Sequence, residues 1–260
     1  MSSVRVHYEV TSGPAGAATV VLANSLGSTM AMWDRQVAAL ATAFTVVRFD
    51  TRGHGGSPVP AGPYSIDDLV DDAVGLLDDL ALDRVHFVGL SLGGMVGMRL
   101  AARAPERIDH LALLCTGAHL VPTQAWTDRA TLVRAEGSGA VAAAVVARWY
   151  TEQYRTDHPD VVASAEAMVR ATPTEGYAAC CEVIAAMDLR PDLSTISAPT
   201  LAIAGADDPA TPPSALAEIA GGVQNGRLLI VPSAAHLAND EQPDIVTEAL
   251  LNHLGVGAWR

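Results

Sequence analysis

Basic residues are scarce in this chain of 260 residues, which has 16 lysines and arginines against 29 aspartates and glutamates. The formal net charge is −13 at pH 7. Nucleic acids and anionic membrane surfaces are themselves negative, so this charge argues against either as the main partner. It also provides no long-range attraction for an anionic substrate, which would therefore need arginines placed locally at its binding site.

Cysteines and long hydrophobic runs are scarce too. The three cysteines, Cys115, Cys180 and Cys181, are odd in number and two are adjacent, which favours reduced thiols over a disulfide framework. No apolar run approaches the roughly 18 residues that a membrane span needs, and the N-terminal MSSVRVHYEV has no signal-peptide core. We therefore expect a soluble, cytoplasmic protein without a membrane partner.

Apolar residues are abundant, at 50% of the chain, which is enough for a sizeable core. Short apolar runs rich in β-branched residues recur along the sequence. Several are nearly continuous, as is typical of strands that are buried on both faces of a parallel sheet. The runs are VRVHYEV, TVVLAN, FTVVRFD, RVHFVGL, HLALLC, PTLAIAG and GRLLIVP.

Helical patterns separate many of these runs. Residues 65–82 begin with Ser65 and Asp68 at the spacing of a capping box, and their apolar residues recur at intervals of three and four. Residues 94–104 form a second helical pattern, which Pro105 ends. Strands that alternate with helices predict an α/β fold.

One segment departs from this alternation. Residues 117–195 contain no convincing strand and have Ala-rich helical stretches such as SGAVAAAVVARWY. We therefore predict a core made of residues 1–116 and 196–260. A helical insertion over residues 117–195 would join the strand that ends near Cys115 to the one that begins near Pro199.

The stretch GLSLG, residues 89–93, fits the pattern G-x-S-x-G between a predicted strand and a predicted helix. In such a nucleophile elbow a sharp, strained turn lifts the serine hydroxyl above the edge of the sheet. Side chains at Gly89 and Gly93 would collide with the adjoining helix and strand, so glycine is favoured there. A phosphate-binding loop is the alternative, but neither G-x-G-x-x-G nor the Walker pattern is present at this position. Ser91 is therefore the candidate nucleophile.

A serine needs a base held by an acid, and in this architecture the chain order is Ser, then Asp or Glu, then His. His236, just past the last predicted strand, is the candidate base, because loops gather at the carboxyl end of a sheet. The other seven histidines fit less well. They are His7, His54 and His86, which precede Ser91; His110, at a strand start; His119 and His158, in the insertion; and His253, which we expect to be solvated on the final helix.

The acid is expected after the preceding strand, in LAIAGADDPATPP. Asp208, three residues after the glycine that ends the strand, is the candidate, with Asp207 as the alternative. An oxyanion needs two preorganised donors. One is the backbone N–H of Leu92; the other lies in the loop VLANSLGS, where Leu26 is the first choice and Ser25 the second.

With these residues in place, the sequence resembles the α/β-hydrolase family and, within it, the 3-oxoadipate enol-lactonases. The motifs GLSLGGM, RFDTRGHGGS, GADD and AAHL carry the family resemblance. The resemblance to the 3-oxoadipate enol-lactonases rests on the motifs NSLG, MWD, RWYT, GYAACC and MDLRP. It implies a mostly parallel central sheet flanked by helices, with a helical cap inserted between strands. In that family the loop containing His54 has a shaping role, not a catalytic one.

The resemblance also implies a reaction: hydrolysis of a small anionic enol-lactone to 3-oxoadipate in aromatic catabolism, with no cofactor and no metal. The residues alone indicate only hydrolysis by acyl transfer to Ser91. The same triad would also suit a small-ester carboxylesterase, a cofactor-free haloperoxidase or a carbon–carbon bond hydrolase. A homo-oligomer is compatible with the sequence.

The insertion is expected to cover Ser91, and the carboxylate of such a substrate would need arginine or indole donors there. Trp126, Arg129 and Arg148 resemble the enol-lactonase pattern best. The adjacent Cys180 and Cys181 are interpreted as buried packing in this cap, because no second cluster has metal-ligand spacing. The remaining candidates in the insertion are Arg134, Trp149, Arg155 and Arg170.

Overall fold

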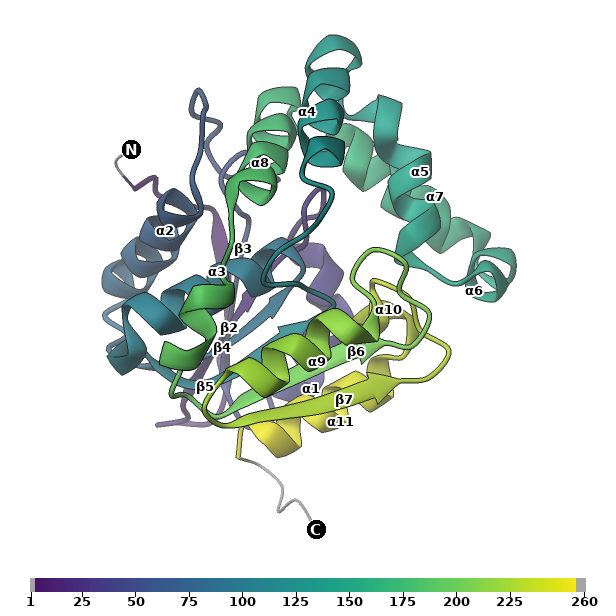
Figure 1. The fold of residues 1–260 in the computed structure, drawn as a ribbon. Coiled ribbons are helices and arrows are strands. Elements are labelled where there is room, and N and C mark those ends of the chain that lie inside the picture. Colours follow the sequence, from purple (N-terminus) through teal and green to yellow (C-terminus); the bar gives the residue numbers. More distant parts are fainter. Residues whose placement is uncertain (1–2, 256–260) are drawn as a thin grey trace.

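The computed structural model describes residues 3–255, and a seven-stranded sheet forms their centre (Figure 1). The strand order is β1-β3-β2-β4-β5-β6-β7, with β1 antiparallel to β3 and all other pairs parallel. Each strand overlaps one of the seven predicted runs. The strands are β1 (Tyr8–Thr11), β2 (Thr19–Ala23), β3 (Thr45–Phe49), β4 (Val85–Leu90), β5 (Ile108–Leu114), β6 (Thr200–Gly205) and β7 (Gly226–Val231).

Helices cover both faces of this sheet (Figure 1). One face carries α2 (Ile66–Asp79), α3 (Leu92–Arg103) and α9 (Pro213–Gly222). The other face carries α1 (Asp34–Leu40) and α11 (Pro243–His253), and the short α10 (Ala238–Glu241) precedes α11. Every residue of β2, β4 and β6 is buried, as their continuous apolar sequences predict. The structure confirms the predicted α/β-hydrolase fold class.

The helix boundaries follow local chemistry. At α2 the predicted capping box is confirmed: the Ser65 side chain accepts the N–H of Asp68, whose carboxylate accepts the N–H of Ser65. Helix α3 begins at Leu92, two residues earlier than predicted, because the sharp turn at Ser91 itself starts the helix.

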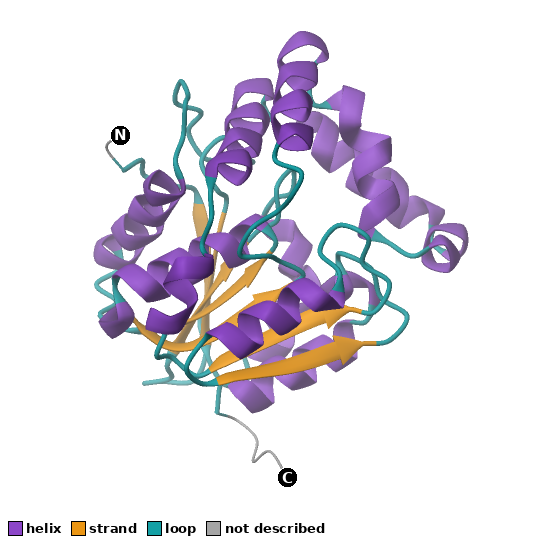
Figure 2. Ribbon diagram, viewed as in Figure 1, coloured by secondary structure: helices purple, strands orange, loops and turns teal. Residues whose placement is uncertain are grey.

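The predicted insertion holds five helices, which gather on one side of the sheet (Figure 2). Among the described residues 117–195 there is no strand, as the sequence indicates. The division of the chain into a core and a cap at these positions stays a prediction. The helices are α4 (Gln124–Glu136), α5 (Gly139–Trp149), α6 (Glu152–Asp157), α7 (Pro159–Ala171) and α8 (Thr174–Ala186).

Helix α8 packs closely against the loop that follows β3. A Cβ atom built on Gly176 would lie 2.1 Å from the carbonyl oxygen of Gly53, in the loop after β3. Cys180 and Cys181 follow on the same helix and are fully buried, as expected for packing residues. Within residues 3–255, no helix combines the length and apolar character that crossing a lipid bilayer requires.

The N-terminus of α3 packs against β2 at a distance that only glycine permits. A Cβ on Gly93 would lie 2.3 Å from the carbonyl oxygen of Ala23, and one on Gly89 would lie 2.2 Å from the carbonyl oxygen of Gly93. Neither contact can be relieved by a side-chain rotation, because both involve main-chain atoms. The structure thus confirms the reason for the two glycines around Ser91.

Replacing Gly93 by Ala is expected to lower the free energy of unfolding by at least about 2 kcal/mol, because the added methyl group overpacks the junction of α3 and β2. Gly221→Ala is the matched control. No atom lies within 4 Å of its Cβ position near the end of α9, so this change should stabilise the protein by about 0.5–1 kcal/mol. Urea unfolding of both variants measures their free energies of unfolding. Equal values for the two variants would contradict the prediction that Gly93 is required by the close packing of α3 on β2.

Candidate active site

Ser91 lies in a strained turn at the carboxyl end of the central strand β4. Its backbone has φ 55° and ψ −116°, a conformation that non-glycine residues rarely adopt. Main-chain bonds hold the turn: the Ser91 N–H donates to the carbonyl of Leu114 at 2.9 Å, and the N–H of Met95 donates to the Ser91 carbonyl at 3.0 Å. Strain retained by a well-bonded turn is typical of functional sites.

His236 and Asp208 form a buried pair beside this turn. His236 follows β7, Asp208 follows β6, and the two side chains meet with Nδ1 of the ring 2.8 Å from Oδ2 of the carboxylate. The loops come together because Gly205 has no side chain, since a Cβ there would lie 2.2 Å from the carbonyl oxygen of Ala235. Asp207, the alternative acid, is exposed and has no side-chain contact to His236 among the described residues.

Asp208 is a carboxylate that the protein keeps ionised. Burial alone would raise its pKa, but the adjacent His236 and the hydrogen bonds from Thr211 hold the pKa below its ordinary value. Its Oδ1 accepts the N–H groups of Ala210 and Thr211 at 2.8 and 3.1 Å, and its Oδ2 also accepts the Thr211 hydroxyl at 2.6 Å. A carboxylate fixed in this way can orient an imidazole and stabilise its cation.

One cavity of about 230 Å³ brings Ser91 and His236 together with residues from the predicted insertion. This volume lies below the roughly 300–1,000 Å³ that is typical of sites for drug-sized ligands, so the cavity suits a small molecule. All three predicted substrate-binding residues, Trp126, Arg129 and Arg148, line it. The predicted oxyanion loop contributes Ser25 and Leu26, and other walls come from Leu120, Val145, Trp149, Tyr177, Pro209 and Thr211.

The loop after β2 distinguishes between the two predicted oxyanion donors. The N–H of Ser25 is already used, because it donates to the sulfur of Met32 at 3.3 Å. For the N–H groups of Leu26 and Leu92, no acceptor is found within the part of the chain that the structure describes. Both residues are buried, and two unpaired main-chain N–H groups are the kind of donors that an oxyanion site uses.

His54 holds this loop from behind and takes no part in the cavity wall. Its Nε2 accepts the N–H of Gly27 at 2.9 Å, while Nδ1 lies 3.2 Å from the carbonyl oxygen of Arg52. Only a neutral ring can make both contacts, with Nδ1 as the donor. Complete burial lowers the pKa of His54 to about 4, so the ring is neutral near pH 7. Sequence reasoning gave this loop-shaping role, and the structure identifies Gly27 as the partner.

Arg129 and Arg148 approach the cavity without a carboxylate partner among the described residues. Burial, and then the positive charge of Arg129, lower the pKa of Arg148. Arg129 stacks on the ring of Trp126, with its guanidinium carbon 4.5 Å from the ring centroid. Guanidinium groups are the side chains best suited to bind a carboxylate, and two of them line this small cavity.

The other arginines of the insertion are less suited to this role. Arg134 pairs with Glu175 and Glu182, and Arg170 pairs with Glu166 on its own helix. None of these contacts belongs to the cavity. Arg155 also lies outside the cavity wall.

Tyr177 is a cavity residue that sequence reasoning missed. Its ring packs against the loop after β2, where a Cβ on Gly27 would lie 2.8 Å from Cε2. Its hydroxyl is buried, makes no hydrogen bond of standard geometry among residues 3–255, and lies close to the guanidinium group of Arg129. Burial raises the pKa of Tyr177, so the group stays a neutral donor. The tyrosine is part of the motif GYAACC, but nothing in the sequence indicates that it faces the cavity.

The prediction that His253 is solvated was wrong. Only 8% of this residue is exposed, and its Nε2 lies 3.0 Å from the carbonyl oxygen of Leu111. Helix α11 packs on β5, so a histidine near its end is turned inward. Burial lowers the pKa of His253 to about 4, which keeps the ring neutral.

Comparisons with known proteins agree with this architecture. Residues 18–243 match the family described as alpha/beta hydrolase fold. The chain is 38% identical to 3-oxoadipate enol-lactonase 2 of Acinetobacter baylyi, over 95% of this chain and 92% of that protein.

Two solved structures extend the similarity to three dimensions. The crystal structure of the enol-lactonase from Burkholderia xenovorans LB400 superimposes with a TM-score of 0.93 at 42% identity, covering 96% of each chain. A thermophilic esterase from Thermogutta terrifontis, solved with malate bound, gives a TM-score of 0.90 at 30% identity. It covers 96% of this chain and 92% of its own.

The contact between His54 and Gly27 predicts a pH-dependent stability. The unfolded chain titrates His54 near pH 6.5, whereas burial keeps the folded pKa at about 4, so the unfolded state binds more protons as the pH falls between these values. The contribution of His54 to the free energy of unfolding is therefore fully present above about pH 6.5 and is lost as the pH falls toward 4. Between pH 7 and pH 5, His54 alone should account for a loss of about 2 kcal/mol in the free energy of unfolding.

Urea unfolding of His54→Gln at both pH values tests this expectation, because the pH-dependent difference should shrink by about 2 kcal/mol in that variant. The exposed His158 offers a control, and His158→Ala should keep the difference of the wild-type protein. An unchanged difference in His54→Gln would show that His54 is not the group responsible.

Proposed function

The chain belongs to the alpha/beta hydrolase fold family and is a carboxylic-ester hydrolase, and we propose that it opens the lactone ring of 3-oxoadipate enol-lactone by serine catalysis. The observation that carries this substrate is the cavity that Ser91 and His236 share with the unpaired Arg129 and Arg148. A neutral ester would leave both guanidinium groups without an anion, whereas a carboxylate-bearing lactone satisfies them.

In the proposed mechanism Ser91 Oγ attacks the lactone carbonyl carbon while His236 accepts the hydroxyl proton. Asp208 orients the ring through Nδ1 and stabilises the imidazolium that forms. The N–H groups of Leu26 and Leu92 hold the developing oxyanion. Collapse of the tetrahedral intermediate breaks the ring C–O bond, and His236 returns the proton to the departing enol oxygen, which then tautomerises to a ketone.

The second half of the reaction repeats these roles with water. His236 removes a proton from the water that attacks the acyl-enzyme, and the proton then passes to Ser91 as the acyl group leaves. The product is an open chain with two carboxylates. Asp208 remains ionised throughout, in keeping with its lowered pKa.

The substrate carboxylate would be recognised on the side of the cavity formed by α4 and α5. Arg129 is braced by the ring of Trp126, so its guanidinium loses little freedom when it binds an anion. Arg148 on α5 and the buried hydroxyl of Tyr177 complete the donors. The similarity to enol-lactonases at 38% and 42% identity supports this substrate, and the similar esterase from Thermogutta terrifontis was solved with malate, a small dicarboxylate, bound.

Ser91→Ala should lower kcat for the enol-lactone by about 10⁶-fold, as the loss of a triad nucleophile does in other serine hydrolases. Ser91 is not held by packing of its side chain, so the circular dichroism spectrum and the unfolding midpoint should stay unchanged. Hydrolysis is followed by loss of the lactone absorbance. Retention of more than a few per cent of the activity in a contamination-free preparation would exclude the serine mechanism.

Asp207 and Asp208 are adjacent, so matched substitutions can test which of them is the acid that orients His236. Asp208→Asn should reduce kcat by about 10⁴-fold, because the ring is then held in the wrong tautomer and its cation loses its counter-ion. Asp207→Asn removes an equal charge one residue away and should leave kcat within about twofold, because Asp207 is exposed and does not contact His236. Similar losses in the two variants would mean that the loop, and not Asp208, is responsible.

Removal of Arg129 or Arg148 should separate anionic from neutral substrates. A charge-assisted contact in this partly buried cavity contributes roughly 1.5–3 kcal/mol, which corresponds to about 10- to 150-fold in kcat/KM for the enol-lactone. A small neutral ester such as p-nitrophenyl acetate has no carboxylate to place and should be nearly unaffected.

Arg170→Ala is the control for general damage to this layer, because Arg170 pairs with Glu166 on the surface of α7 and does not line the cavity. Equal losses on both substrates in Arg129→Ala and Arg148→Ala would assign these arginines a structural role. Rapid hydrolysis of neutral esters with no turnover of the enol-lactone would instead identify a small-ester carboxylesterase.

A further inference from the structure

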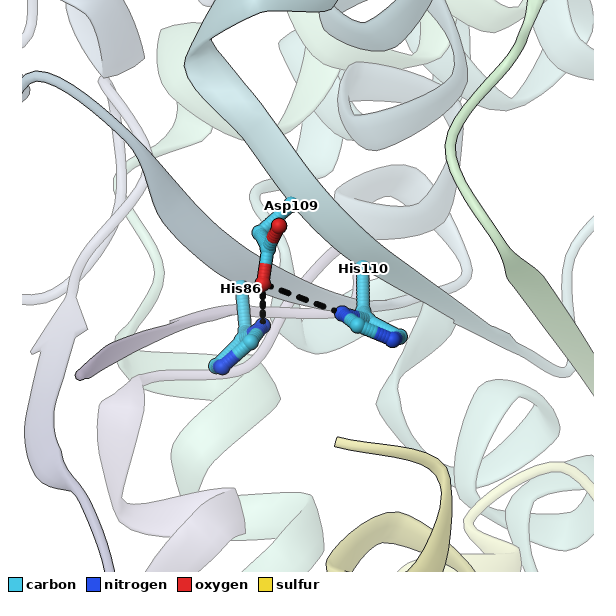
Figure 3. Close-up of side chains that lie close together, drawn as sticks. All are labelled: His86, Asp109 and His110. Atoms are coloured by element: carbon cyan, nitrogen blue, oxygen red, sulfur yellow. Dashed lines mark hydrogen bonds and ion pairs between the residues drawn. The ribbon is translucent and has the colours of Figure 1, made fainter. Parts of the chain in front are cut away.

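A second cluster of polar side chains lies at the opposite end of the sheet from Ser91. It consists of His86 on β4 and of Asp109 and His110 on β5, near the amino ends of both strands. Figure 3 shows both imidazole rings turned toward the same carboxylate oxygen of Asp109. The proposed hydrolysis uses none of these residues.

A β-bulge creates this convergence. Val85 pairs with Ile108, but Phe87 pairs with Leu111, so the single residue His86 faces two residues of β5. Consecutive side chains of a regular strand point to opposite faces of the sheet, whereas a bulge re-aims one of them. Asp109 and His110 can therefore both reach His86.

The distances within the cluster are compatible with one metal ion, and the His110–Asp109 pair is also within hydrogen-bonding distance. Nδ1 of His86 lies 3.5 Å from Oδ2 of Asp109, and Nδ1 of His110 lies 3.2 Å from the same oxygen. Ligands about 2.0–2.1 Å from a tetrahedral Zn²⁺ are separated from one another by about 3.3 Å. All the ligand atoms of the cluster lie within 4.8 Å of one another.

His86 gives independent support for a missing ligand. Its side chain is only 5% exposed, yet Nδ1 has no hydrogen-bond partner among the described residues, and the nearest carboxylate oxygen, Oδ2 of Asp109, lies 3.5 Å away. Buried polar atoms are nearly always satisfied, so an orphan of this kind needs an explanation.

We propose that His86, Asp109 and His110 bind one divalent transition-metal ion, with Zn²⁺ as the preferred ion. Two imidazole nitrogens and one carboxylate oxygen are ligands that zinc accepts, and water completes the coordination. Asp109 and His110 are partly exposed, so an ion can reach them from solvent, and His110 also borders a cavity of about 510 Å³.

The surroundings of the cluster are compatible with a bound cation. Arg84 contacts Oδ1 of Asp109 at 3.0 Å and leaves Oδ2 to the two histidines. Carboxylates that bind metals are commonly oriented by such an additional donor. The rings of Phe44 and His110 lie 5.3 and 5.2 Å from that of His86 and fix its orientation.

The proposed ion would tie β4 to β5 and would not take part in hydrolysis. His86 and Ser91 are five positions apart in the sequence, which corresponds to roughly 16 Å along an extended strand. Binding should therefore stabilise the folded chain without supplying a group to the reaction.

Zinc binding to the full-length protein, freed of metal by a chelator and dialysis, tests the proposal. Calorimetric titration with Zn²⁺ should give one equivalent per chain, and saturating Zn²⁺ should raise the unfolding midpoint by about 5 °C or more. Asp109→Asn and His110→Ala should each weaken binding by at least about tenfold and abolish the shift. His236→Ala, which removes the other buried ring–carboxylate pair, should bind as the wild-type protein does.

A spectroscopic variant keeps the test decisive if those substitutions impair folding. His110→Cys places a thiolate in the cluster, and Co²⁺ should then give a sulfur-to-metal charge-transfer band that the wild-type protein lacks. The three native cysteines are fully buried and contribute no such band. Absence of zinc binding, binding that survives both Asp109→Asn and His110→Ala, or a folded His110→Cys variant without the band would overturn the proposal.

Discussion

The active site depends on one backbone constraint: the chain must leave β4 through the strained turn at Ser91 and enter α3 at once. Gly93 makes this possible, because the main chain of α3 can then touch that of β2. The same approach lets the Gly93 N–H donate to the carbonyl of Asn24 at 2.9 Å, at the start of the loop that carries Leu26. Main-chain contacts thus fix the positions of Ser91 and of the unpaired N–H groups of Leu26 and Leu92 relative to one another. Donors fixed in advance in this way can stabilise a developing oxyanion.

Under the proposed function, local charge must recognise the anionic substrate in a protein whose net charge opposes the approach of anions. The net charge of −13 repels anions at a distance, and most described arginines are neutralised by nearby carboxylates, as Arg134 is by Glu175 and Glu182. Arg129 and Arg148 are different, because they repel one another and neither forms an ion pair with a carboxylate of the described chain; Asp208 offsets the charge of Arg148 only in part. The cavity is therefore the place where an incoming carboxylate gains most, and discrimination comes from contacts made after entry.

Much of this arrangement could be predicted from the sequence, because it depends on local order along the chain. The strands follow continuous apolar runs, and Ser91, Asp208 and His236 each follow a strand at its carboxyl end. The residues that were missed depend on packing between distant segments. Tyr177 reaches the cavity because α8 folds over the loop of Gly27, and His253 is buried because α11 packs on β5. Neither contact leaves a periodic signal in the sequence.

The bulge between β4 and β5 illustrates the same limit. His86 is more than twenty residues from Asp109 in the sequence, and regular alternation would place Asp109 and His110 on opposite faces. Only the slip in register brings them together. Strand β4 is buried along its whole length. Its reactive or metal-binding side chains, His86 and Ser91, lie where its regular geometry is interrupted, at the bulge and at the strained turn. In a regular sheet the main-chain polar groups bond to the neighbouring strands and the side chains alternate between the two faces. A bulge or a strained turn breaks this alternation, so side chains at these positions can be directed toward a ligand or a substrate.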